Sequence, residues 1–301
     1  MTTPTHEKVF PEDKRVKLPL PFIFRRLHSL LGVWLVLFLF EHLLTNSQAA
    51  LFFYDDGYTF VRMVNKIHEL PYLRAIEILF LGLPFLIHGL WGVHYAITSR
   101  TNSFSGKGKT PALPQYKRNR AFTWQRVTAW VVVVGVVLHV IQMRFMEYPT
   151  LVVQGDAEVY MVQVKDDAQS RNVAKELKAE VYRENELAKA PHDAEWRDAA
   201  MSKKLKKGQV LVAAPNAGAA IFFVVRDTFK SPLMVLLYSI FVVTAVYHAF
   251  NGLWTAFISW GITLTRRSQK KMRYFTTFLM WVVMIFGLMA CWGPYWTFVW
   301  H

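Results

Sequence analysis

Four histidines carry most of the chemistry that this sequence could perform. His42, His88, His139 and His248 each lie inside a separate long apolar segment. Ionisable residues within membrane spans are rare and costly, so they usually face the bundle interior and serve a function. One such histidine could simply hydrogen-bond to a neighbouring helix, whereas four at matched depths would indicate two ligand pairs.

The segments that carry these histidines are long enough to cross a membrane. The chain has 301 residues, of which 53% are hydrophobic, and a helical span needs about 20 apolar residues. A sixth apolar run, 209–225, is shorter and contains Pro215, so we do not count it. Five spans are predicted, at about 27–51, 74–98, 122–146, 232–264 and 274–300.

The net charge of +14 comes from basic residues beside the spans, so nucleic acid is not an expected partner. Lys and Arg accumulate before span I, between II and III, and between IV and V, which predicts that these segments and the N-terminus are cytoplasmic. The stretch 147–230 holds 13 basic and 13 acidic residues and is expected to face outward.

Depth along the helices gives an outer pair. His42 lies 16 residues beyond Arg26 and His139 lies 13 beyond Arg126, which is about 24 and 20 Å from the cytoplasmic ends of spans I and III. Both histidines should therefore lie near the outer face of the membrane.

His88 and His248 give an inner pair. Spans II and IV enter from outside near Arg74 and Pro232, 14 and 16 residues earlier, so these histidines lie about 21 and 24 Å down. Two neutral imidazoles on facing helices can hold one haem iron, whereas zinc needs three or four ligands at one point. The sequence therefore predicts two haems, each with two histidine ligands.

A basic group near the inner level could bind the haem carboxylates. His28 should face the bundle, and Arg25, Arg26, Ser29 and Arg126 lie at the same depth. Cations and hydroxyls suit propionate groups. The arginines could equally be topological charges.

Glu77 is the only carboxylate in span II and lies at its outer entry. It could exchange protons with a quinone headgroup, or it could pair with Arg74 at the interface.

Three glycines share a helical face with a histidine. Gly92, Gly135 and Gly252 each lie four residues from one in sequence. They could leave room for a flat macrocycle or allow close helix packing.

The chain divides into three parts: 1–149 with spans I–III, an insertion at 150–230, and 231–301 with spans IV–V. Leu151 to Val164 is β-like, 166–207 has helical character, and 208–227 returns to a β-like apolar run. We expect an all-α membrane bundle of five helices with a small mixed outer insertion.

Several motifs resemble one family. RRLHSLLGVWL with EHLL, PFLIHGLWGVHYA, WQRVTAW with LHV, and YHAFNGLWTAFISWGITLTRRSQ resemble the dihaem cytochrome b membrane anchor of succinate:quinone oxidoreductases, in its single-polypeptide five-helix form. The similarity covers spans I to IV, and the family's ligand positions fall on the four histidines named above.

The resemblance implies a bacterial inner-membrane subunit that binds two haem b groups and a quinone, with menaquinone the usual partner. Flavoprotein and iron–sulfur subunits would dock on its cytoplasmic face, and Glu77 matches an acidic position linked to quinone chemistry. Fumarate reduction is the reverse alternative. Some fumarate-reducing members carry a glutamate where this chain has Val246, which favours succinate oxidation.

Two other classes of protein remain as alternatives. The cytochrome b of another respiratory dehydrogenase would also have histidine pairs, although four motifs in this order argue against it. A transporter would have spans interrupted by Gly or Pro in corresponding halves, and Pro84 is the only clear interior proline in spans I to IV.

Overall fold

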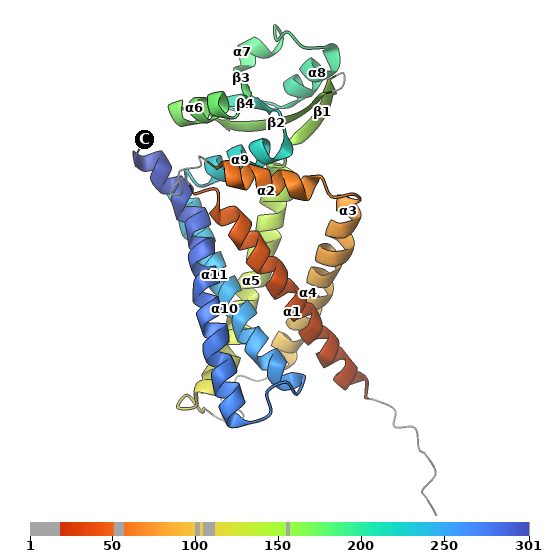
Figure 1. Ribbon diagram of the computed structural model, residues 1–301, viewed down its shortest axis with the longest axis vertical. Helices are drawn as coiled ribbons and strands as arrows, with labels where there is room; N and C mark the ends of the chain where they lie inside the picture. Colours follow the sequence, from red (N-terminus) through yellow and green to blue (C-terminus); the bar gives the residue numbers. More distant parts are fainter. Residues whose placement is uncertain (1–18, 51–56, 100–102, 105–111, 155–156, 301) are drawn as a thin grey trace, which may run out of the picture.

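A computed structural model describes residues 19–50, 57–99, 103–104, 112–154 and 157–300 (Figure 1). Within these ranges, five helical runs are long and apolar enough to cross a membrane, which confirms the five predicted spans. They are α1 (Leu20–Ser47), the run α3 (Leu73–Ile76), η2 (Glu77–Gly82) and α4 (Leu83–Thr98), the run α5 (Lys117–Val140) and η3 (Ile141–Met146), α10 (Pro232–Ser259) and α11 (Arg266–Trp300).

Helix α10 lies at the centre of the bundle and packs on α1, α5 and α11. Glycines permit the close crossings: a Cβ on Gly135 would lie 2.3 Å from the Phe241 ring, and one on Gly287 would lie 2.5 Å from Val242. A Cβ on Gly252 would lie 3.3 Å from Gln125. Of the two explanations for Gly135, the structure therefore favours close helix packing.

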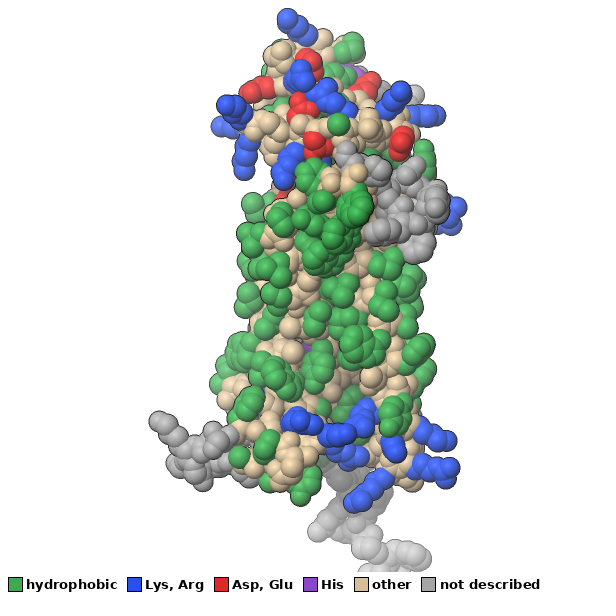
Figure 2. All heavy atoms as spheres, turned by 90° about the vertical axis from the view of Figure 1, so that its left-hand side faces the viewer, with side chains coloured by type: hydrophobic (Ala, Val, Ile, Leu, Met, Phe, Trp, Pro, Cys, Tyr) green, Lys and Arg blue, Asp and Glu red, His purple; other side chains and the backbone are tan. Residues whose placement is uncertain are grey.

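The surface of the bundle separates apolar from charged side chains. Figure 2 shows apolar side chains over the long middle of one face, with Lys and Arg gathered at one end. The other end carries a unit with side chains of both charges. We call the end that carries this unit the domain end and the opposite one the loop end.

The unit at the domain end is built on a four-stranded antiparallel sheet with the order β1-β2-β4-β3. Short helices cover it and fill the connections. The elements are β1 (Thr150–Gln154), β2 (Ala157–Lys165), α6 (Ala168–Glu176), β3 (Glu180–Tyr182), α7 (Glu184–Leu187), α8 (Ala194–Ser202), β4 (Gln209–Ala214) and α9 (Ala217–Thr228).

The two faces of this sheet belong to different cores. Trp196 of α8 packs with Met161 and Leu211 in a small core on one face. On the other face, Val212 joins Phe222 of α9 in a cluster that continues into the bundle as far as Val283. The sheet is therefore fused to the membrane helices by apolar packing.

Helix α2 (Tyr58–His68) completes this junction by packing on α9. Gly218 of α9 lies so close that an added Cβ would be 2.3 Å from the Val61 carbonyl oxygen. The Asn65 side chain accepts a hydrogen bond from the Gly218 amide at 2.7 Å and donates one to Asn216 at 3.0 Å.

The second half of the run 208–227 is helical, so the β-like assignment was wrong there. β4 occupies Gln209–Ala214, but Asn216 then accepts a hydrogen bond from the Ala219 amide and caps α9. An Asn side chain in this position favours the start of a helix. At 12 residues, α9 is too short to cross a membrane.

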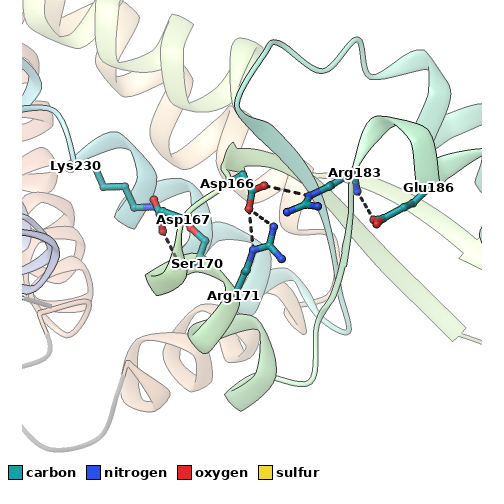
Figure 3. Close-up of polar contacts among 7 residues, drawn as sticks. All are labelled: Asp166, Asp167, Ser170, Arg171, Arg183, Glu186 and Lys230. Atoms are coloured by element: carbon teal, nitrogen blue, oxygen red, sulfur yellow. Dashed lines mark hydrogen bonds and ion pairs between the residues drawn. The ribbon is translucent and has the colours of Figure 1, made fainter.

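A cluster of ion pairs holds the unit to the start of α10 (Figure 3). The buried Lys230 ammonium lies 2.6 Å from Asp167, 3.2 Å from Asp227 and 2.7 Å from the Ser170 hydroxyl. Asp167 and Ser170 come from the β2–α6 region, and Asp227 comes from α9. The cluster therefore joins these two segments to Lys230, which lies immediately before α10.

These contacts lower the pKa of two carboxyl groups. The Arg171 guanidinium, with help from Arg183, holds the pKa of Asp166 below its usual value. Burial alone would raise the pKa of Asp167, but hydrogen bonds from Lys230 and Ser170 outweigh it and leave that pKa lowered. A depressed pKa in the folded state stabilises the fold above the unfolded pKa of about 3.9 and loses this effect as pH falls through the folded pKa.

The domain-end unit should therefore lose stability in acid. Between about pH 5 and about pH 2, its unfolding temperature should fall, since both carboxylates bind protons more readily when unfolded. Lys230→Met should cost about 3 kcal/mol at neutral pH and reduce the acid dependence, whereas the exposed Lys189→Met should do neither. Differential scanning calorimetry of the protein in detergent measures both, and a flat pH profile would contradict the prediction.

A second expectation concerns helix packing. Gly135→Ala should lower the free energy of unfolding by about 1–3 kcal/mol, because the added methyl group meets the Phe241 ring. Gly89→Ala has nothing within 4 Å of its new Cβ and should leave stability unchanged or raise it by up to about 1 kcal/mol. Thermal unfolding in detergent compares the two, and equal effects would be evidence against the packing role.

Candidate functional site

The structure brings His42 of α1 and His139 of α5 together at the domain end of the bundle. Their ring centres are 5.9 Å apart and the ring planes are inclined by 79°. Phe38 packs on His42 with ring centres 5.3 Å apart, and Phe241 lies 6.0 Å from His139.

His88 of α4 and His248 of α10 meet towards the loop end. Their ring centres are 6.4 Å apart and their planes are inclined by 89°. His28 of α1 stacks on His88 with ring centres 4.0 Å apart and planes within 6° of parallel. Three imidazoles from three helices therefore gather at this level.

Both pairs have the spacing of two imidazoles that share one metal atom. A metal–nitrogen distance of about 2.0 Å and about 1.1 Å from that nitrogen to the ring centre give two ring centres about 6.2 Å apart. The observed 5.9 and 6.4 Å lie on either side of this value. Among the residues that the structure describes, no group of three or more His, Cys, Asp or Glu side chains could hold a metal ion, and each level brings one predicted histidine pair together.

Backbone carbonyls fix the tautomer of the loop-end pair. Nδ1 of His88 lies 3.1 Å from the His28 carbonyl oxygen, and Nδ1 of His248 lies 3.2 Å from that of Gln125. A carbonyl oxygen can only accept, so each neutral ring carries its proton on Nδ1 and keeps the Nε2 lone pair. Metal-ligating histidines are typically oriented in this way.

Amide side chains that the sequence analysis missed support His248. Gln125 donates from Nε2 to the His248 carbonyl at 3.0 Å and accepts from Asn251 Nδ2 at 2.7 Å. Asn251 in turn accepts from the Trp254 indole at 2.9 Å. Polar amides within apolar spans, at positions 125 and 251, were the sequence signal that could have identified them.

The residues predicted to bind the haem carboxylates lie at the loop end, but only some of them come together. Arg126 donates to the carbonyls of Ala96 and Ser99 at the end of α4, while its Nε and Nη1 are buried without a hydrogen-bond partner. Nδ1 of His28 is likewise buried and unpaired. These orphaned donors suit an anionic group.

Arg26 and Ser29 both contact Trp260, and the sequence did not predict these contacts. The Arg26 guanidinium lies 5.5 Å from the Trp260 ring centre, and its Nη1 is buried without a partner. The Trp260 indole donates to the Ser29 hydroxyl at 3.3 Å. Arg25 is exposed and donates to the Pro21 carbonyl, so it does not join this group.

Glu77 pairs with Arg144 and not with Arg74, which corrects the interface-pair alternative. The Glu77 carboxylate lies 2.6 Å from the Arg144 guanidinium, and each side chain is about one-third exposed. Arg144 also lies over the Tyr148 ring at 4.3 Å. His68 is close enough for both charges to act on it, and burial is the main reason that its pKa is lowered.

The two partners of this ion pair stand on wide helical turns. Glu77 opens the π-helical η2, and Arg144 lies within the π-helical η3. Such turns are rare and often occur at functional sites. Glu77 and Arg144 lie on different spans, so spacing along one helix could not predict this pairing.

Comparison with known proteins gives one clear similarity. The chain is 27% identical over 270 residues to the succinate dehydrogenase cytochrome b558 subunit of Bacillus subtilis (strain 168). The aligned region covers 89% of this chain and 95% of that protein. No protein family model and no solved structure matches the chain.

Proposed function

We propose that this chain is the cytochrome b membrane anchor of a succinate dehydrogenase, and that it holds two b haems between an iron–sulfur subunit and a membrane quinone. One observation carries the proposal: histidines from four spans pair two by two at two levels, with ring centres 5.9 and 6.4 Å apart. The similarity to the Bacillus subtilis subunit along nearly its whole length supports it.

Four histidines hold the iron in this proposal. His42 and His139 are the axial ligands at the domain end, and His88 and His248 are those nearer the loop end. Bound haem supplies one-electron transfer at each level. The carbonyls that accept from Nδ1 of His88 and His248 keep Nε2 available, and all four histidines are partly buried within the bundle.

The buried donors near the loop end would bind the propionates. Arg26, Arg126 and His28 each have a buried nitrogen without a hydrogen-bond partner, and an unpaired buried donor is costly. A carboxylate would satisfy these groups. Ser29 belongs to the same cluster through Trp260, while the exposed Arg25 is better explained as a topological charge.

The Glu77–Arg144 pair is the proposed quinone site at the domain end. A partly exposed carboxylate can hold or release a proton at a headgroup, and the ion pair with Arg144 fixes its position. Menaquinone is the expected acceptor. The flavoprotein and iron–sulfur subunits would bind the loop end, which places the N-terminus in the cytoplasm.

Replacing single histidines tests the ligand pairs. His42→Ala and His139→Ala should each remove the same haem, and His88→Ala and His248→Ala should each remove the other. Reduced-minus-oxidised spectra with pyridine haemochrome analysis of the purified complex count the haems. Loss of the same haem from His42→Ala and His88→Ala would break the pairing, and a colourless wild-type complex would end the proposal.

Neutralising Glu77 tests the quinone site. Glu77→Gln should slow succinate:quinone turnover at least about 10-fold, because the proton-transfer group is lost, while both haems remain. Succinate oxidation with an artificial acceptor should be unaffected. The exposed Glu69→Gln is the matched control, and an unchanged quinone rate in Glu77→Gln would leave the carboxylate as a purely structural ion-pair partner.

A further inference from the structure

A chain of side-chain hydrogen bonds links His139 to the domain-end unit. Nδ1 of His139 lies 3.2 Å from the Tyr238 hydroxyl, which lies 3.1 Å from Gln142 Oε1. Gln142 Nε2 lies 3.0 Å from Glu147 Oε1, and the Thr228 hydroxyl lies 3.0 Å from Glu147 Oε2. The chain runs from a histidine inside the bundle to a carboxylate at its edge.

The Glu147 carboxylate at the far end determines which group donates in each hydrogen bond of this chain. An ionised carboxylate only accepts, so the Gln142 amide must turn its nitrogen to Glu147 and its oxygen to Tyr238. Tyr238 has one hydroxyl proton and gives it to Gln142, which leaves its oxygen to accept from Nδ1 of His139. His139 therefore carries its proton on Nδ1 and keeps its Nε2 lone pair.

The surrounding packing holds the chain in place. The Tyr238 ring lies edge-on to Phe229, with ring centres 5.2 Å apart, and edge-on to His139 at 5.8 Å. Thr228 is only 8% exposed and also lies 2.8 Å from the Val224 carbonyl. Thr228 is the last residue of α9, so the domain-end unit itself holds the Glu147 carboxylate at the end of this hydrogen-bond chain.

The loop-end pair has no equivalent. Nδ1 of His88 and of His248 meet neutral backbone carbonyls. In the described residues of the spans below the domain end, 19–40, 78–99, 112–146 and 228–300, there is no Asp or Glu. Among the hydrogen bonds of the described residues, those of the domain-end pair therefore lead to a carboxylate, whereas those of the loop-end pair do not.

We propose that Tyr238 and Gln142 are positioning residues that fix the tautomer of His139 and connect it to the charge of Glu147. A hydrogen bond from Nδ1 towards a negative group makes the imidazole a stronger electron donor to its metal. This stabilises the oxidised iron and lowers the potential of the domain-end haem relative to the other. The inference rests on the proposed function, since it needs a haem at His139.

Redox titration of the purified complex tests this inference. Tyr238→Phe removes the hydroxyl and keeps the ring, so both haems should remain while the redox equilibrium of one shifts about tenfold towards the reduced form, or about 59 mV for a one-electron couple. The affected haem should be the one that His42→Ala removes. Glu147→Gln should move the same haem in the same direction.

A matched control separates this effect from loss of packing. Tyr295→Phe changes another tyrosine, whose ring packs beside Trp292 and Trp296, and should move neither potential. Should Tyr238→Phe fail to assemble, Glu147→Gln provides the same readout from outside the span. Unchanged potentials in the assembled variants, or equal shifts of both haems, would overturn the inference. Absence of haem from the wild type would overturn the proposed function instead.

Discussion

The hydrogen bond at Nδ1, which three of the four proposed ligand histidines make, is the interaction on which the proposed centres depend. An imidazole in a membrane bundle can rotate or change tautomer, and only a fixed Nδ1–H leaves Nε2 in place for a metal. Two of the four histidines are held by carbonyls of neighbouring helices and a third by a tyrosine. The partners belong to different spans from the rings they hold, so helix packing sets the geometry of the site.

This dependence gives the domain-end unit a role in the membrane part of the protein. Its sheet shares a core with the bundle, Lys230 ties it to the start of α10, and Thr228 contacts Glu147 at the end of η3. A unit attached at three such points restrains α5 and α10 relative to each other. These are the helices that carry His139 and Tyr238.

The sequence was sufficient for the spans and for the depth of the histidines, because span length and rise per residue are local properties. It was insufficient where a side chain's partner lies on another helix. Arg74 was the nearest cation to Glu77 in sequence, yet the carboxylate meets Arg144 of another span. Tyr238, Gln125 and Asn251 were missed for the same reason. The prediction for the run ending at Asp227 was wrong for a different reason. An apolar segment can form either a strand or a buried helix, and here the Asn216 cap favours the helix.

The most direct test of the central claim is the electron paramagnetic resonance spectrum of the oxidised complex at low temperature. Two low-spin ferric signals in equal amounts, each with the features of bis-imidazole ligation, are predicted. A high-spin signal would mean that an iron lacks one of its histidines. That result, or a single low-spin signal, would contradict the account.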